Sequence, residues 1–181
     1  MQPALRFSAE LLLKAQGIQA LLLDVDGVLT PGNLLFSAQG ESLKAFNTLD
    51  GHGLKMLQKS GITPVVISGR DSDALRSRLH ALGITQMQLG VEDKKPAAQI
   101  ILQALGLNWE HVAAMGDDWP DLPLLNNAAF GCAPPNAHVE VRAAADHVTD
   151  AKGGEGAVRE LCDLLLMASG HYAKLLQGFN A

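Results

Sequence analysis

Residues 20–30, ALLLDVDGVLT, constrain this chain more than any other segment. The run ALLL has the pattern of a short strand buried on both faces of a parallel sheet. Asp24 and Asp26 follow where this strand should end, and ligands bind at the carboxyl edge of an open parallel sheet. In an extended backbone both side chains point the same way, and two close carboxylates repel each other. The segment therefore indicates a metal ion, or an acid beside a nucleophile, while a strand that ends in a plain Asp-Gly turn fits it nearly as well.

The rest of the chain predicts strands that alternate with helices. Apolar runs indicate strands over residues 63–68, 86–89, 112–115, 129–132 and 147–148. Helical spacing and end signals predict helices over residues 7–16, 54–60, 73–82, 96–105, 122–126, 139–144 and 157–167. This alternation predicts a three-layer, Rossmann-like α/β fold with one mostly parallel sheet. Apolar runs at 34–36 and 43–46 flank a Gly-containing turn and predict a small β-hairpin, either a flap beside the first strand or a plain surface hairpin.

Length and composition fit a single domain over residues 1–181, with 170–181 as a C-terminal tail. The net charge of −5 provides no general attraction to nucleic acid or to an anionic membrane, so a few local cations must hold any anionic substrate. No segment approaches the roughly 20 apolar residues of a membrane span. The amino terminus lacks the pattern of a signal peptide, and Cys132 and Cys162 are expected to be free buried thiols. We therefore expect a cytoplasmic protein.

Three more strand ends carry polar residues. Ser68 ends the second strand, Lys94 follows the third, and Asp117, Asp118 and Asp121 follow the fourth. Each is ordinary when taken alone: a turn serine, a solvated lysine, an acidic helix start. Together with DVDGVLT, and in this order, they resemble the four motifs of the haloacid dehalogenase-like phosphatases over almost the whole chain. Asp118 and Asp121 can orient Lys94 or a metal-bound water, and capping of the following turn is an equal alternative.

The resemblance implies a role for each motif residue. Asp24 would be the nucleophile that forms an aspartyl-phosphate, and Asp26 the general acid and base. Mg²⁺ would be held by Asp24, by the backbone carbonyl of Asp26 and by Asp117. Lys94 and Ser68 would bind the phosphate, around which positive charge must gather during transfer.

The spacing of the motifs leaves no room for a cap domain. Only 44 positions separate Asp24 from Ser68, and 26 separate Ser68 from Lys94. The site of a monomer would then be open to water, whereas hydrolysis of a small molecule favours an enclosed site. The segments KAFN, DG, ISGR, GDD and GAVRE resemble the capless 3-deoxy-D-manno-octulosonate 8-phosphate phosphatase family, which closes its sites by forming tetramers.

Membership of that family would imply a homotetramer that hydrolyses this sugar phosphate to the free sugar acid and phosphate, in lipopolysaccharide biosynthesis. Arg70 and Arg78 are similar to the arginines that hold the substrate carboxylate, although a surface salt bridge is the alternative for Arg78. The remaining substrate contacts would come from one loop, made of Asn47, Thr48, Leu49, Asp50 and Gly51.

Two positions depart from the family pattern: His52 stands where tyrosine is expected, and Glu155 where arginine or histidine is frequent. An acidic Glu155 leaves open a phosphatase for a nine-carbon 2-keto sugar acid phosphate. A non-catalytic oligomerisation module is an alternative of another class, but a decayed site would have lost a motif residue, and every motif is complete here. The tail from residue 170 is either a disordered end or a segment that reaches a neighbouring site.

Overall fold

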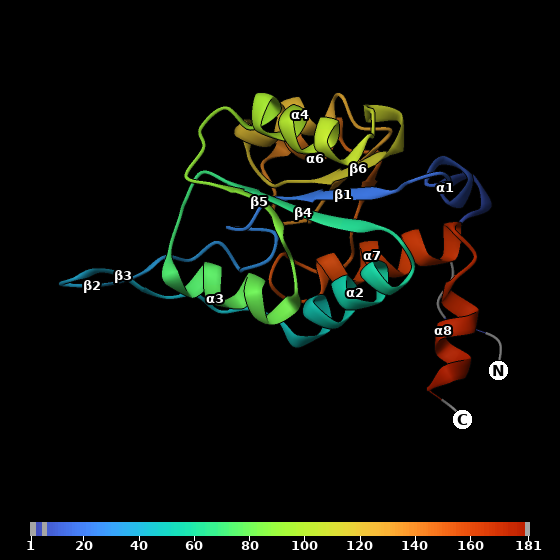
Figure 1. The fold of residues 1–181 in the computed structure, drawn as a ribbon, viewed down its shortest axis with the longest axis horizontal. Helices are drawn as coiled ribbons and strands as arrows, with labels where there is room; N and C mark the ends of the chain where they lie inside the picture. The colour runs from blue at the N-terminus through green and yellow to red at the C-terminus, as the bar shows by residue number, and fades with distance from the viewer. Residues whose placement is uncertain (1–2, 5–6, 180–181) are drawn as a thin grey trace.

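The computed structural model describes residues 3–4 and 7–179, which form the predicted three-layer α/β fold (Figure 1). Parts of the signal-peptide expectation and of the predicted tail fall on residues 1–2, 5–6 and 180–181, outside the described residues. The main sheet has the strand order β5-β4-β1-β6-β7-β8, and all its pairings are parallel. Its strands are β1 (Ala20–Leu23), β4 (Thr63–Ser68), β5 (Gln86–Leu89), β6 (Val112–Met115), β7 (Phe130–Ala133) and β8 (His147–Val148).

Helices cover both faces of this sheet (Figure 1). One face carries α2 (Thr48–Lys59), α3 (Asp73–Leu82) and α7 (Ala157–Ala168), and the other carries α4 (Lys94–Leu105), α5 (Leu122–Leu125) and α6 (Val139–Ala144). β1 is buried on both sides, because Leu21 and Leu23 belong to the core under α2 and α7 while Leu22 belongs to the core under α4. Its continuous apolar run is therefore the expected pattern of a central parallel strand.

Two elements extend from this body (Figure 1). The predicted hairpin is confirmed as β2 (Leu35–Ser37) and β3 (Gly40–Leu43), an antiparallel pair whose apolar side chains are exposed. At the other end, α1 (Ala9–Lys14) precedes the sheet and α8 (Tyr172–Gly178) follows α7. Most of the predicted tail from residue 170 is a helix and not a disordered end, because Tyr172 and Leu175 pack against the core and give the segment a helical apolar face.

The start of α2 also differs from the prediction. We expected a polar loop before a helix at residue 54, but the helix begins six residues earlier, at Thr48. Two glycines in this segment suggested a loop, and the structure shows that they serve close packing. A Cβ atom at Gly51 would lie 2.4 Å from the Arg78 side chain, and one at Gly53 would lie 3.0 Å from that of Cys162.

The other global expectations concern the membrane and the thiols. Among the described residues, no helix combines the length and the apolar character that a bilayer span requires. Cys132 and Cys162 are both buried and free, as predicted.

The loop after β1 is held by a second loop, residues 152–156. Asn136 bridges the two, since its side chain donates to the Gly27 carbonyl at 3.2 Å and accepts from the Gly153 N–H at 2.8 Å. The Gly154 N–H donates to the Val28 carbonyl at 2.8 Å. A Cβ atom at Gly153 would lie 1.7 Å from the Gly27 oxygen, so only glycine permits this approach. The loop that carries Asp26 is thereby fixed from outside the sheet.

We expect Gly153→Ala to lower the free energy of unfolding by about 1–3 kcal/mol, because the added methyl group forces the two loops apart. Urea denaturation followed by circular dichroism measures this change. Gly178→Ala is the control, because a Cβ atom there meets nothing within 4 Å. Equal stability of the two variants would contradict the close approach.

Candidate active site

The strand order brings the predicted site residues to one edge of the sheet. β1 lies between β4 and β6, so Asp24, Ser68 and Asp117 follow adjacent strands at the same edge. Lys94 reaches this edge from the first turn of α4, after β5. All four, together with Asp26, line one cavity of about 560 Å³. The predicted convergence of the four motifs is therefore present in the structure.

Lys94 is the centre of a buried group of charges. Its ammonium nitrogen lies 2.5 Å from Asp24 Oδ1 and 2.6 Å from Asp121 Oδ1, and all three side chains are less than 10% exposed. Burial lowers the pKa of Lys94, but the two carboxylates outweigh it and raise the pKa above its ordinary value. Lys94 therefore remains a cation at neutral pH.

The sequence left two roles open for Asp121, to orient Lys94 and to cap a turn, and in the structure Asp121 has both. One carboxylate oxygen pairs with Lys94, and the other accepts from the backbone N–H groups of Asp117 at 3.0 Å and Asp118 at 3.3 Å. It thus caps the turn after β6 and orients the lysine. The sequence alone indicates that Asp121 can cap the turn. The contact between Asp121 and Lys94 could not be predicted, because it depends on where α4 begins relative to β6.

The carboxylates around Lys94 crowd one another. Asp24, Asp117 and Asp121 each present an oxygen within 4.8 Å of the others. Burial and the neighbouring Asp24 and Asp121 raise the pKa of Asp117 to about 7, and burial with Asp121 raises the pKa of Asp24 to about 6. A divalent cation relieves such repulsion, and carboxylate oxygens are the ligands that Mg²⁺ prefers. With both Asp121 oxygens engaged, Asp24 and Asp117 are the carboxylates available to a metal ion.

The cavity as a whole is acidic. Six carboxylates but only two basic side chains line it: Asp24, Asp26, Glu92, Asp117, Asp118 and Asp121, against Arg70 and Lys94. An anionic phosphate entering such a cavity meets net repulsion unless a cation is present. The composition of the lining therefore fits a bound divalent metal ion.

Asp26 is held by a lysine that the sequence did not single out as a site residue. Its Oδ1 atom lies 2.5 Å from Lys44 Nζ and 3.4 Å from Thr30 Oγ1. Its Oδ2 atom lies 3.9 Å from Arg70 Nε and has no hydrogen-bond partner among the described residues. Lys44 belongs to the KAFN segment, which carried the family resemblance but gave no sign that the ammonium is turned inward.

Only some of the residues that we expected to bind the sugar lie at the cavity. Arg70 lines the cavity, with its side chain half exposed. Arg78 donates to the Asn47 carbonyl at 3.2 Å, and its guanidinium lies 5.7 Å from the centre of the Phe46 ring. The cavity lining does not include Arg78 or residues 47–51.

Residues 47–51 form the beginning of α2. Asn47 caps the helix, since its side chain accepts from the Leu49 N–H at 2.7 Å. Asp50 is buried and accepts from the Arg159 N–H at 2.8 Å, so it links α2 to α7. Burial raises the pKa of Asp50 to about 6. Of the two departures from the family pattern, Glu155 is exposed, and His52 is also exposed, its ring packing on Phe179 after α8 at 5.6 Å.

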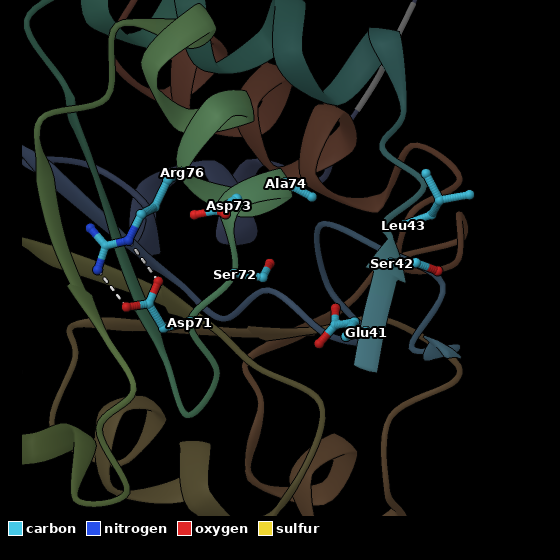
Figure 2. A pocket seen from close by; sticks show the side chains of 8 residues that line it. All are labelled: Glu41, Ser42, Leu43, Asp71, Ser72, Asp73, Ala74 and Arg76. Atoms are coloured by element: carbon cyan, nitrogen blue, oxygen red, sulfur yellow. Dashed lines mark hydrogen bonds and ion pairs between the residues drawn. The ribbon is translucent and has the colours of Figure 1, made fainter. Parts of the chain in front are cut away.

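A second cavity, of about 620 Å³, is lined by residues of β3 and by residues around the start of α3 (Figure 2). Figure 2 shows Glu41 and its neighbours on β3 facing Asp71, Asp73 and Arg76 at the start of α3, with Arg76 paired to Asp71. Its one basic side chain is thus already engaged, and its lining carries three carboxylates against this one cation. An anionic substrate is therefore better placed in the cavity with Lys94 and Arg70.

Known proteins are similar to this chain along most of its length. Residues 87–161 match the family model described as haloacid dehalogenase-like hydrolase, a segment that contains Lys94 and Asp117. The 3-deoxy-D-manno-octulosonate 8-phosphate phosphatase of Escherichia coli K12 is 42% identical over 163 residues, which are 90% of this chain and 87% of that protein. The phosphatase of the same name from Haemophilus influenzae is 41% identical over 157 residues, 87% of each chain.

Solved structures agree with these relatives. The Moraxella catarrhalis phosphatase, in complex with a magnesium ion, a phosphate ion and KDO, superposes with a TM-score of 0.91 at 38% identity, covering 94% of this chain and 98% of its own. A probable YrbI family phosphatase from Pseudomonas syringae gives 0.93 at 42% identity, covering 96% and 99%. The cobalt-bound enzyme of H. influenzae gives 0.89 at 40%, covering 93% and 99%.

We expect Asp117→Asn to raise the melting temperature of the metal-free protein by about 2–4 °C at pH 8. Folded Asp117 keeps its proton up to a pKa of about 7, against an ordinary value of 3.8, so its ionisation lowers stability as the pH rises through this window. The gain should therefore shrink at pH 5.

Thermal unfolding in EDTA and in Mg²⁺ measures this prediction. Mg²⁺ should raise the melting temperature of the unmodified protein at pH 8, and the variant should lose this shift. Equal destabilisation of Asp117→Asn at pH 5 and at pH 8 would contradict the repulsion between Asp117 and the neighbouring carboxylates.

Proposed function

Because this chain belongs to the haloacid dehalogenase-like hydrolases, in the family of the 3-deoxy-D-manno-octulosonate 8-phosphate phosphatases, we propose that it is a Mg²⁺-dependent phosphatase of that sugar phosphate. Its products are the free sugar acid and phosphate. The observation that supports the chemistry is the single cavity in which Asp24 and Asp26 lie beside the buried cation Lys94. The sugar is assigned from the relatives that share this site.

In the first step Asp24 attacks phosphorus, and the bond between phosphorus and the sugar oxygen breaks. Asp26 gives its proton to that leaving oxygen, and an aspartyl-phosphate forms on Asp24. Lys94 and the Ser68 hydroxyl hold the phosphoryl oxygens, over which negative charge is spread. When bound by Asp24, Asp117 and the Asp26 carbonyl, Mg²⁺ supplies positive charge that offsets this negative charge and that of the surrounding carboxylates.

In the second step water attacks the phosphorus of the aspartyl-phosphate. Asp26, now ionised, takes a proton from this water, and the bond between phosphorus and Asp24 breaks. Phosphate leaves, and both carboxyl groups return to their starting states. One residue can serve as acid and then as base because it stands two positions from the nucleophile, at the same edge of the sheet.

The carboxylate of the sugar acid needs a cation besides Lys94. Arg70 meets this need, because it lines the cavity and its side chain is half exposed. We assign Arg78 and residues 47–51 to substrate binding as well, with a role that depends on closure of the site around the sugar. A nine-carbon 2-keto sugar acid phosphate would present the same carboxylate, and it is the second candidate substrate.

A non-catalytic oligomerisation module is disfavoured by the energetics of the site. Burial and the neighbouring carboxylates raise the pKa of Asp117 to about 7, which means that its ionised form destabilises the fold at neutral pH. A buried lysine and crowded carboxylates are characteristic of a working site and give a passive module no advantage. The two buried free thiols are consistent with a reducing compartment, so we place the enzyme in the cytoplasm and its reaction in lipopolysaccharide biosynthesis.

We expect the purified protein with Mg²⁺ to release phosphate from 3-deoxy-D-manno-octulosonate 8-phosphate in preference to a nine-carbon analogue, phosphoserine and an aryl phosphate. Asp24→Asn should reduce turnover at least about 1,000-fold, because it removes the nucleophile. Asp73→Asn, an exposed carboxylate at the start of α3, is the matched control and should retain full activity. Preference for another phosphate would overturn the substrate, and no turnover on any would overturn the function.

We also propose that the enzyme is a homotetramer in which neighbouring subunits close the site. The hairpin supports this proposal, because Leu35, Phe36 and Leu43 are 46–63% exposed on a strand pair that extends from the body (Figure 1). Exposed apolar side chains gathered on one element favour a protein interface. The active cavity lacks a cap domain, so a neighbour is the available source of enclosure.

Phe36→Asp should convert the assembly to smaller species and lower kcat/KM for the sugar phosphate by about tenfold or more, because the substrate is then poorly enclosed. Size-exclusion chromatography with light scattering measures the mass, and activity on dilution measures the coupling. Ile100→Asp on α4 is the control, since Ile100 has nearly the same exposure, 62% against 63%. A wild-type monomer with full activity would contradict the proposal.

A further inference from the structure

We propose that Lys44 is a positioning residue for Asp26: its ammonium group holds Asp26 by Oδ1, so that Oδ2 is the oxygen that carries the proton. This inference rests on the proposed phosphatase function. It adds a residue that acts through the general acid and base, and it assigns the two oxygens of Asp26 different tasks.

The position of Lys44 is unusual for a lysine. It directly follows β3, at the base of an exposed hairpin, yet its side chain is only 1% exposed. Its ammonium nitrogen lies 2.5 Å from Asp26 Oδ1 and 2.7 Å from Glu41 Oε1. A lysine is rarely buried unless it is paired, because removing an ammonium group from water is expensive. The inward turn of the side chain brings the ammonium group into contact with the carboxylates of Asp26 and Glu41, which pair with it.

The two oxygens of Asp26 have unlike surroundings. Oδ1 accepts from the Lys44 ammonium and faces the Thr30 hydroxyl at 3.4 Å. Oδ2 is buried and has no hydrogen-bond partner among the described residues. A proton on Oδ1 would meet the Lys44 ammonium, whose nitrogen is 2.5 Å away, whereas the nearest cation to Oδ2, Arg70 Nε, is 3.9 Å away; the proton of the acid form therefore belongs on Oδ2. Since Asp26 lines the active cavity, Oδ2 is the oxygen whose hydrogen-bonding capacity is left for a substrate.

The proton balance follows from this assignment. In the first step the proton leaves Oδ2 for the sugar oxygen, as the bond from that oxygen to phosphorus breaks and the bond from Asp24 to phosphorus forms. In the second step Oδ2 receives a proton from the attacking water. Lys44 keeps all its protons throughout and prevents the carboxyl group from turning, which would exchange its two oxygens.

Glu41 extends this arrangement to the hairpin. It lies in β3 and pairs with the same ammonium group, and Figure 2 shows it beside the cavity at the start of α3. The position of β3 therefore bears on the orientation of Asp26 through one buried side chain. Contacts made by the hairpin with a neighbouring subunit would act on the general acid by this route.

The test compares two substrates in a single sample. Lys44→Met keeps the length of the side chain but removes its charge. It should lower kcat/KM about 10–100-fold for the sugar phosphate, whose alkoxide leaving group needs a proton. For p-nitrophenyl phosphate, whose leaving group departs without one, the loss should stay below about threefold. The ratio of the two values does not depend on the fraction of protein that is folded, so partial misfolding leaves it intact.

Three further variants complete the experiment. Lys44→Arg keeps the charge and should keep the substrate ratio near that of the unmodified enzyme. In an Asp26→Asn background, Lys44→Met should add less than about twofold, because Lys44 acts through Asp26. Lys55→Met, an exposed lysine on α2, should change neither substrate.

Equal losses on both substrates, or full additivity with Asp26→Asn, would overturn the inference while leaving the phosphatase function intact. Failure of the unmodified enzyme on every sugar phosphate would overturn the proposed function instead. If another alkyl phosphate is the true substrate, the same comparison is made with that compound, and its ratio decides.

Discussion

The buried ion group of Lys94, Asp24 and Asp121 is the interaction on which the rest of the site depends. It joins the end of β1, the start of α4 and the turn after β6, three segments far apart in the chain. None of its members is stable alone in this position, because an unpaired buried charge is strongly destabilising. The lysine balances the charge of two crowded carboxylates, and it meets them where a phosphoryl group must bind.

Much of this arrangement was predictable from the sequence, for a simple geometric reason. Strands buried on both faces have continuous apolar runs, and the carboxyl ends of parallel strands lie at one edge of the sheet. Asp24, Ser68 and Asp117 each follow such a run, so their convergence requires only the correct fold class.

The parts that were not predictable depend on contacts across the fold. Gly51 and Gly53 are loop signals in the sequence, but in the structure they are positions where α2 meets Arg78 and Cys162. Lys44 reads as a surface residue of a hairpin, and only the path of the chain after β3 turns its ammonium toward Asp26. The helix at 172–178 forms where Tyr172 and Leu175 find an apolar surface on the core. In each case a local rule was overridden by packing partners distant in sequence.

Glycine at two positions makes the crowding of carboxylates feasible. A Cβ atom on Gly27 would lie 1.9 Å from an Asp117 oxygen, and one on Gly116 would lie 2.2 Å from the Asp121 Cβ. These glycines stand in the two acidic motifs because the carboxylates occupy the space that a side chain would need. At this edge of the sheet, the backbone thus holds close together carboxylates that repel each other. The site is consequently less stable than its surroundings when empty, and a phosphate with its metal ion supplies the charges that complete it.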